Sequence, residues 1–210
     1  MLALTSLEVD PVLAECSYLE GDVLIEAVED LSDRVRYRLD YAYILVGAGL
    51  SLRAGALLKD VVRLAQTSSD DAFRIDVLYT QAEFACLLGL HAYAVQLWSQ
   101  LIAQAPEGMV DPLALAGARA NRALDQIWVG ALDDTEEDLR VAADAFHKMG
   151  HDQMVAWLTA ARGDVASRRG DYARAGKLLA AAGDTLKEVV SHPAVEYFEI
   201  AGRLAARVGR

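Results

Sequence analysis

The sequence has few prolines, which interrupt helices, and few cysteines, which cross-link small folds: it contains 4 prolines and 2 cysteines in 210 residues. Because proline is the strongest helix breaker, so small a number permits a chain that is helical nearly throughout. The 54% share of hydrophobic residues, rich in Ala and Leu, favours helices as well. Cys16 and Cys86 form no CxxC pair and no disulfide framework, so we expect a reducing compartment, the cytoplasm.

Basic residues are also few, since the chain has 20 Lys and Arg but 31 Asp and Glu, which gives a net charge of -11. Nucleic-acid binding depends on a basic face that neutralises phosphates, so this balance argues against a nucleic-acid partner. It favours a basic or neutral partner over an acidic one.

The N-terminus has no basic residues before an apolar run and no cleavage-site pattern, so a signal peptide is not expected. One apolar stretch, residues 41–58, carries only Arg53 as a charge, and its small residues would suit a packed membrane helix. The alternative is a buried helical hairpin that turns at Gly49. We favour the hairpin, and no membrane association is expected.

The strongest signal is an internal repeat centred on Gly49, Gly89, Gly130 and Gly170, which lie 40, 41 and 40 residues apart. A small residue lies seven positions before each glycine, and another lies five positions after it. A large apolar residue lies nine positions after each glycine, and a Val, Leu or Ala lies twelve positions after it. In that order the four columns are Ala42, Ala82, Ala123, Gly163; Ala54, Ala94, Thr135, Ala175; Leu58, Trp98, Leu139, Leu179; and Val61, Leu101, Ala142, Ala182.

Each unit has the form of two helices joined at the glycine, which adopts a left-handed conformation without a Cβ penalty. Small residues let the two backbones approach, and several units must stack to bury their apolar faces. The pattern predicts helical pairs over 33–48 and 51–66, 71–88 and 90–104, 111–129 and 132–149, and 152–169 and 171–189. A last helix near 193–208 would cap the stack through Val195, Phe198, Ala201, Ala205 and Val208.

These offsets resemble the tetratricopeptide repeat (TPR), most clearly over 162–182. The resemblance implies an all-α, right-handed superhelix (α-solenoid) of about four antiparallel helix pairs. Residues 33–190 would hold the four repeats, 1–32 an N-terminal cap segment and 191–210 a C-terminal capping helix. The spacing of 40 rather than 34 residues keeps HEAT- or armadillo-like pairs as the alternative fold.

No motif indicates catalysis, a cofactor or a metal. His147 and His151 have a helical metal-ligand spacing, but Gly150 between them predicts a helix break. The acidic residues of the segment 133–138 fit the first turn of a helix, where the macrodipole favours carboxylates. The glycines form no phosphate-binding loop, and no nucleophile is placed with a base. We therefore expect a protein that is not an enzyme.

In TPR-like stacks the first helix of each pair lines the concave face, so the resemblance implies a binding groove on that face. The expected partner-binding residues are Arg36, Tyr43, Asp76, Tyr79, Glu83, Asn121, Trp128, Trp157 and Asp164. Aromatic residues with charged neighbours are typical of binding hot spots. The alternative is that Tyr43, Tyr79 and Trp157 pack between adjacent helices.

We therefore expect a protein- or peptide-binding scaffold. Residues 114–182 also resemble the repeat regions of bacterial multidomain signalling and CHAT-type proteins, and this resemblance implies a regulatory setting. Two alternatives belong to other classes. One is a sensor module that binds a small molecule or signalling peptide, and the other is a structural homo-oligomer.

Overall fold

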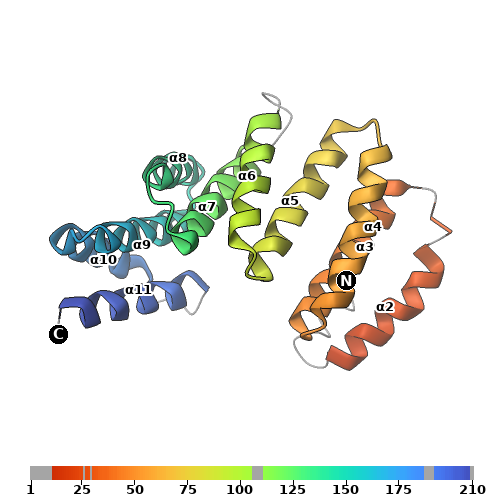
Figure 1. Ribbon diagram of the computed structural model, residues 1–210, viewed down its shortest axis with the longest axis horizontal. Coiled ribbons are helices and arrows are strands. Elements are labelled where there is room, and N and C mark those ends of the chain that lie inside the picture. Colours follow the sequence, from red (N-terminus) through yellow and green to blue (C-terminus); the bar gives the residue numbers. More distant parts are fainter. Residues whose placement is uncertain (1–10, 26, 29, 106–110, 187–191, 209–210) are drawn as a thin grey trace. The chain divides into compact units, whose positions relative to one another are not determined.

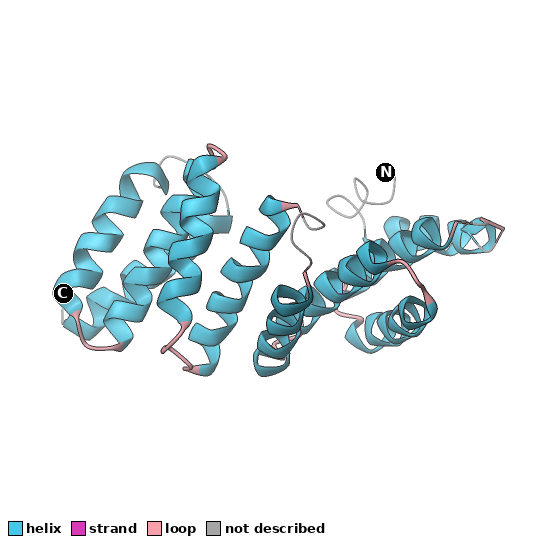
Figure 2. Ribbon diagram, turned by 90° about the horizontal axis from the view of Figure 1, so that it is seen from above, coloured by secondary structure: helices cyan, strands magenta, loops and turns pink. Residues whose placement is uncertain are grey.

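The computed structural model describes residues 11–25, 27–28, 30–105, 111–186 and 192–208. In these ranges the chain forms ten α-helices and no strand (Figures 1 and 2). They are α2 Pro11–Ile25, α3 Leu31–Gly47, α4 Ser51–Thr67, α5 Asp71–Leu87, α6 His91–Gln104, α7 Pro112–Val129, α8 Thr135–Lys148, α9 Asp152–Arg168, α10 Tyr172–Leu186 and α11 His192–Val208. The prediction of an all-α fold built from helical pairs is confirmed.

Each predicted turn glycine lies between the two helices of its pair in the left-handed region, with φ between 73° at Gly89 and 84° at Gly170. At every one of these turns the N–H of the residue after the glycine bonds to a carbonyl five positions back, as Leu90 N does to Ala85 O at 2.8 Å. This bond satisfies a carbonyl that the end of the helix leaves free. The sequence pattern therefore located the turns correctly.

The same geometry applies to the apolar stretch 41–58, which folds as the hairpin of α3 and α4 around Gly49 (φ 77°). No helix in the described part of the chain combines the length and the hydrophobicity needed to cross a membrane.

The four repeat columns are buried, apart from Leu58, which is partly buried. Ala42, Ala54 and Ala82 are 0% exposed, which is the result of close backbone approach between helices. Thr135 takes the place of an alanine in its column, and its hydroxyl donates to Ala131 O at 2.9 Å. The threonine is tolerated because its buried polar atom has a partner.

The chain divides into two compact units, Met1–Leu97 and Trp98–Arg210, with the boundary inside α6. In unit 1, α2 packs on α3 through Tyr18, whose ring stacks on Tyr41 at 5.1 Å between centroids. The core of unit 1 continues through Ile44 and Phe84, both 0% exposed. A helix thus covers the start of the first predicted pair; residues 1–10 of the expected N-terminal segment lie outside the described ranges.

In unit 2, α11 packs against both α9 and α10 and caps the last pair, as predicted. The predicted face of this helix is partly wrong, because Phe198 is 56% and Val208 38% exposed. Tyr197 and Ile200 are the buried residues instead, at 6% and 5% exposed. The helix is rotated from the expected face because it packs on two helices at once. The division of the chain at residues 32 and 190 stays a prediction.

Candidate functional site

Unit 1 has a polar face on α3 and α5, which are the first helices of its two predicted pairs. We call this face the α3–α5 surface. It consists of Arg36, Asp40 and Tyr43 on α3 and Asp76, Tyr79 and Glu83 on α5. Spacings of three and four residues put each trio on one side of its helix, and the two helices are in contact. Five of the nine predicted binding residues lie on this surface.

Tyr43 is fixed between the two helices by a polar and an apolar contact. Its hydroxyl donates a hydrogen bond to Glu83 Oε2, and its ring lies 4.5 Å from that of Phe84, between centroids. Tyr43, Tyr79 and Glu83 are all half-buried. The ring of Tyr43 therefore packs between adjacent helices, as one of the two interpretations predicted. Its hydroxyl group is still part of the α3–α5 surface.

Burial disfavours the ionised forms of the acidic groups on the α3–α5 surface. Burial raises the pKa of Glu83, although the hydrogen bond from Tyr43 opposes the rise. Burial and then the Glu83 carboxylate raise the pKa of Tyr79 to about 12. Partial desolvation also raises the pKa of Asp76, against the influence of Arg36. The carboxylates therefore oppose folding while they are ionised.

We expect the substitution Glu83→Gln to stabilise unit 1 at neutral pH. Because the pKa of Glu83 is higher in the folded state than in the unfolded one, its contribution is most favourable at acidic pH and decreases as pH rises through the folded pKa. Glutamine cannot ionise, yet its amide oxygen can still accept from Tyr43. Urea titrations followed by circular dichroism at pH 4 and pH 7 measure the effect. A variant less stable than the wild type at pH 7 would contradict this prediction.

Unit 2 contains a small pocket of about 60 Å³ between α7, α9 and α11, which we call the α7–α9–α11 pocket. Its most exposed component is Trp128, with 65% of its surface accessible. The apolar part comes from Ile127, Ala161 and Ile200, which are 5%, 1% and 5% exposed. The remaining lining residues are Leu124, Asp164, Arg168, Glu199 and Arg203.

A charged network forms one side of this pocket. Asp164 is only 3% exposed and accepts from Arg168 Nε at 3.0 Å and from Arg203 Nη2 at 3.4 Å. Arg168 also donates from Nη1 to the carbonyl of Ile127 at 3.0 Å, which ties α9 to the end of α7. The buried carboxylate of Asp164 thus holds the side chains of Arg168 and Arg203 in place, and these two arginines are partly exposed to solvent.

The other two predicted residues of unit 2 do not line this pocket. Trp157 is 9% exposed and belongs to the core between α7, α8 and α9, as the packing alternative foresaw. Asn121 is half-buried on α7. Neither offers much surface to a partner, and a binding role for either stays a prediction.

Sequence analysis missed the contribution of α11, which supplies Glu199 and Arg203 to the pocket. A signal was present, because a further step of about 40 residues from Asp164 and Arg168 leads to Arg203 and Arg207. The step from Asp164 to Arg203 does correspond to a contact, because Arg203 Nη2 donates to Asp164 Oδ2 at 3.4 Å. Arg207 Nη1 donates to Ser167 Oγ, next to Arg168, at 2.8 Å. The capping helix packs on α9, the first helix of the last pair, and on α10.

The acidic residues 136–138 do more than complement the macrodipole of α8. Asp138 is 3% exposed and bound by Arg119 and Arg122 of α7, and Arg122 makes a two-pronged contact at 2.6 and 2.7 Å. Glu136 lies within ion-pair distance of three arginines, Arg162, Arg169 and Arg174, on or just outside α9 and α10. These carboxylates connect α8 to its neighbours on both sides.

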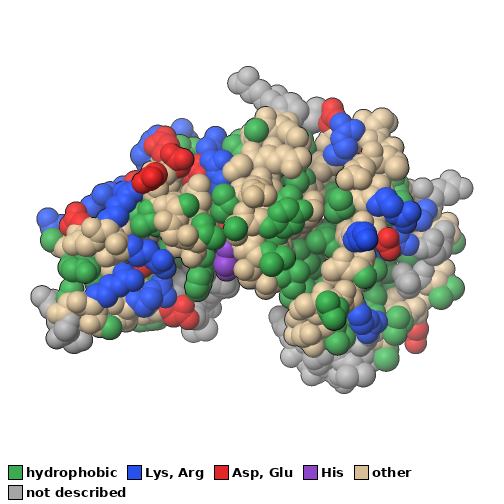
Figure 3. Space-filling model, in the orientation of Figure 1, with side chains coloured by type: hydrophobic (Ala, Val, Ile, Leu, Met, Phe, Trp, Pro, Cys, Tyr) green, Lys and Arg blue, Asp and Glu red, His purple; other side chains and the backbone are tan. Residues whose placement is uncertain are grey.

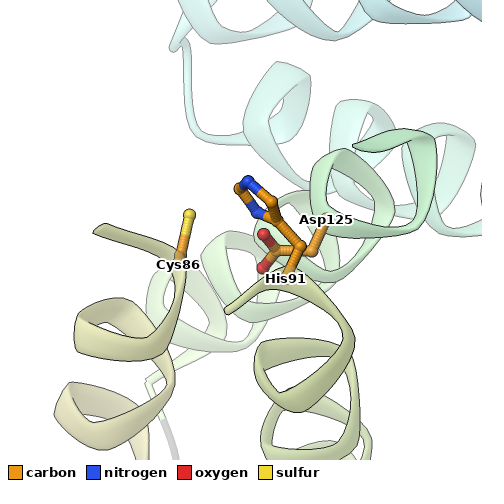
Figure 4. A group of neighbouring side chains, drawn as sticks. All are labelled: Cys86, His91 and Asp125. Carbon is orange, nitrogen blue, oxygen red and sulfur yellow. The ribbon is translucent and has the colours of Figure 1, made fainter. Parts of the chain in front are cut away.

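Figure 4 draws three further side chains, of which Cys86 and His91 lie on either side of the α5–α6 turn in unit 1. They offer two of the four ligands of a tetrahedral zinc site, and no third His, Cys or carboxylate completes the group among the described residues of unit 1. The third residue drawn, Asp125, belongs to unit 2 and accepts the indole N–H of Trp98 at 3.0 Å.

No known protein-family model matches the sequence. No curated protein matches it either.

Solved structures do resemble it. The crystal structure of BtubC (BKLC) from P. vanneervenii has a TM-score of 0.73 at 16% identity, covering 97% of this chain and 85% of that one. A structure of putative kinesin light chain TPR-like repeats from Podosopora anserina has a TM-score of 0.68 at 16% identity, with coverage of 87% and 90%.

Two Rap structures are similar over part of their length. The apo form of RapI has a TM-score of 0.73 at 9% identity, and this chain spans 59% of it. A Rap protein complexed with competence and sporulation factor has a TM-score of 0.63 at 14% identity, and this chain spans 55% of it. Identities this low establish the fold alone, and the fold of this chain is that of a TPR-like repeat protein.

Proposed function

We propose that this protein is a non-enzymatic scaffold that binds a peptide or protein through the inner faces of its first helices. The observation that carries the proposal is Trp128, a large aromatic side chain that is 65% exposed beside a pocket with an apolar floor. Hot spots of binding are enriched in Trp, Tyr and Arg, and they cluster in pockets near the centre of an interface. The Rap protein solved with competence and sporulation factor offers a parallel on a similar fold.

The size of the pocket favours a side chain of a partner over a free small molecule. Sites for small molecules usually have about 300–1,000 Å³, whereas this pocket has about 60 Å³. The α3–α5 surface supports the same conclusion, because the hydroxyl of Tyr43 donates to Glu83 and Tyr79 lies beside the same carboxylate.

Panning of a displayed random peptide library against the full chain tests the proposal. We expect enriched peptides whose affinity falls by about 30-fold or more in the Trp128→Ala variant, since a hot-spot tryptophan contributes about 2 kcal/mol or more. Tyr172→Ala is the matched control, because Tyr172 is a 43% exposed aromatic outside the pocket. Failure to enrich any peptide, or equal binding by both variants, would overturn the proposal.

A further inference from the structure

We infer that the α7–α9–α11 pocket takes a short aliphatic side chain from an acidic peptide segment, and that a carboxylate of this segment pairs with Arg203 in the positive potential of the arginines beside it. This inference rests on the proposed function and names the chemistry of the partner at the same site.

Charge is unevenly distributed along the chain. Residues 152–210 contain nine Lys and Arg against seven Asp and Glu, a net charge of +2, whereas residues 1–151 have eleven against 24, a net charge of -13. In the space-filling view, Lys and Arg gather over the face formed by α9, α10 and α11 (Figure 3). The chain-wide balance of -11, which suggests a basic partner, therefore does not describe this surface.

The guanidinium of Arg203 is incompletely hydrogen-bonded among the described residues. Its Nε is buried and has no hydrogen-bond partner among the described residues. Its Nη2 is 3.4 Å from Asp164, and its Nη1 is 3.8 Å from Glu199, so both contacts are long. A guanidinium has five N–H donors and binds carboxylates through two of them at 2.7–2.9 Å. An incoming carboxylate can therefore provide better contacts than the protein does.

The neighbouring arginines have partners within the protein, which leaves Arg203 to bind the carboxylate. Arg168 is engaged by Asp164 and by the Ile127 carbonyl, and Arg207 by Ser167. Their positive charge adds to the local potential while their side chains stay in place. Arg203 has two acids near it among the described residues: Asp164, which is buried, and Glu199, whose side chain is 62% exposed. A partner carboxylate can replace the exposed Glu199.

The apolar part of the pocket limits the side chain that enters. Its volume of about 60 Å³ is far below the roughly 300–1,000 Å³ of small-molecule sites, so we expect only a small side chain such as Ala or Val to enter it. Trp128 can then cover the neighbouring backbone of the peptide. A small apolar residue flanked by acidic ones meets both requirements.

Three capped peptides test this chemistry in the full chain. They share a central Val, flanked by Asp and Glu, by Asn and Gln, or by Lys and Arg, and binding is followed by tryptophan fluorescence and calorimetry. We expect the acidic peptide to bind at least about tenfold more tightly than the amide peptide, and to weaken as salt increases. Arg203→Gln should weaken it by about tenfold or more, and Glu199→Gln should strengthen it by about two- to fivefold.

The control variant is Lys177→Gln, which removes one exposed positive charge outside the pocket and should change binding little. Equal affinity for the amide or basic peptide, or an unchanged affinity in Arg203→Gln, would overturn the inference. If library peptides bind in a Trp128-dependent way and the acidic peptide does not, the inference fails and the proposed function stands. If no peptide binds at all, both fail. Urea titration of each variant confirms that it is folded.

Discussion

The substitution Trp98→Ala is expected to lower the free energy of unfolding by about 3–5 kcal/mol, the cost of emptying a large aromatic site in a core. Trp98 is 0% exposed and is the largest of the fully buried side chains. Its indole N–H donates to Asp125 Oδ2 at 3.0 Å, and Asp125 is itself 0% exposed. The variant therefore creates a cavity and also removes a donor from a buried carboxylate, and both effects have the same sign.

Urea unfolding followed by tryptophan fluorescence measures this effect. Trp128 and Trp157 remain as probes, and both lie in unit 2, as does Trp98. The matched control is Trp128→Ala, the same chemical change at a position that is 65% exposed, which should cost less than about 1 kcal/mol. Similar losses in the two variants would show that Trp98 is not in the core.

We expect the second large effect from Asp138→Ala, a loss of about 2–4 kcal/mol. Removing one partner of a buried ion pair costs about 3–5 kcal/mol, because the remaining charge stays without its counterion. The expected loss is somewhat smaller here, since the side chains of Arg122 and Arg119 are 19% and 29% exposed and retain some hydration. The contacts at 2.6, 2.7 and 3.1 Å join α8 to α7, so the loss should loosen this pair.

Glu137→Ala is the control one residue earlier in the same helix turn. Glu137 pairs with Arg140 of its own helix, and 63% of its side chain is exposed, so we expect its removal to change the free energy of unfolding far less than Asp138→Ala does. The comparison separates the interhelical pairs from a general effect of acidic charge on the first turn of α8. Equal losses in the two variants would mean that the helix dipole alone explains the run of acids.

The turns of the fold were predictable because they depend on local chemistry. A left-handed residue is required where the chain leaves one helix for the next, and glycine meets that requirement at the lowest cost, so Gly49, Gly89 and Gly170 mark turns in the sequence itself. The buried columns were predictable for a similar reason. Helices that approach closely need small residues at fixed offsets, and these offsets recur every 40 or 41 residues.

The ion pairs were less accessible to sequence analysis. The helix dipole already offers a local explanation for acids at the start of α8, and nothing local distinguishes Asp138, with partners on α7, from Glu137, with a partner on its own helix. The same holds for Asp125, whose partner lies 27 residues away. Charged pairs of this kind depend on side-chain direction and not on composition.

The candidate site shows the same division. By itself the sequence determined that first helices carry aromatic and charged residues at repeating positions, since helical period and repeat spacing place them on one face. Only the tertiary structure decided that Tyr43 and Glu83 are bonded to each other, that Trp157 is core while Trp128 is exposed, and that α11 brings Arg203 to Asp164. Burial and hydrogen bonding arise between helices, where the rotation of each helix about its axis selects which side chains meet.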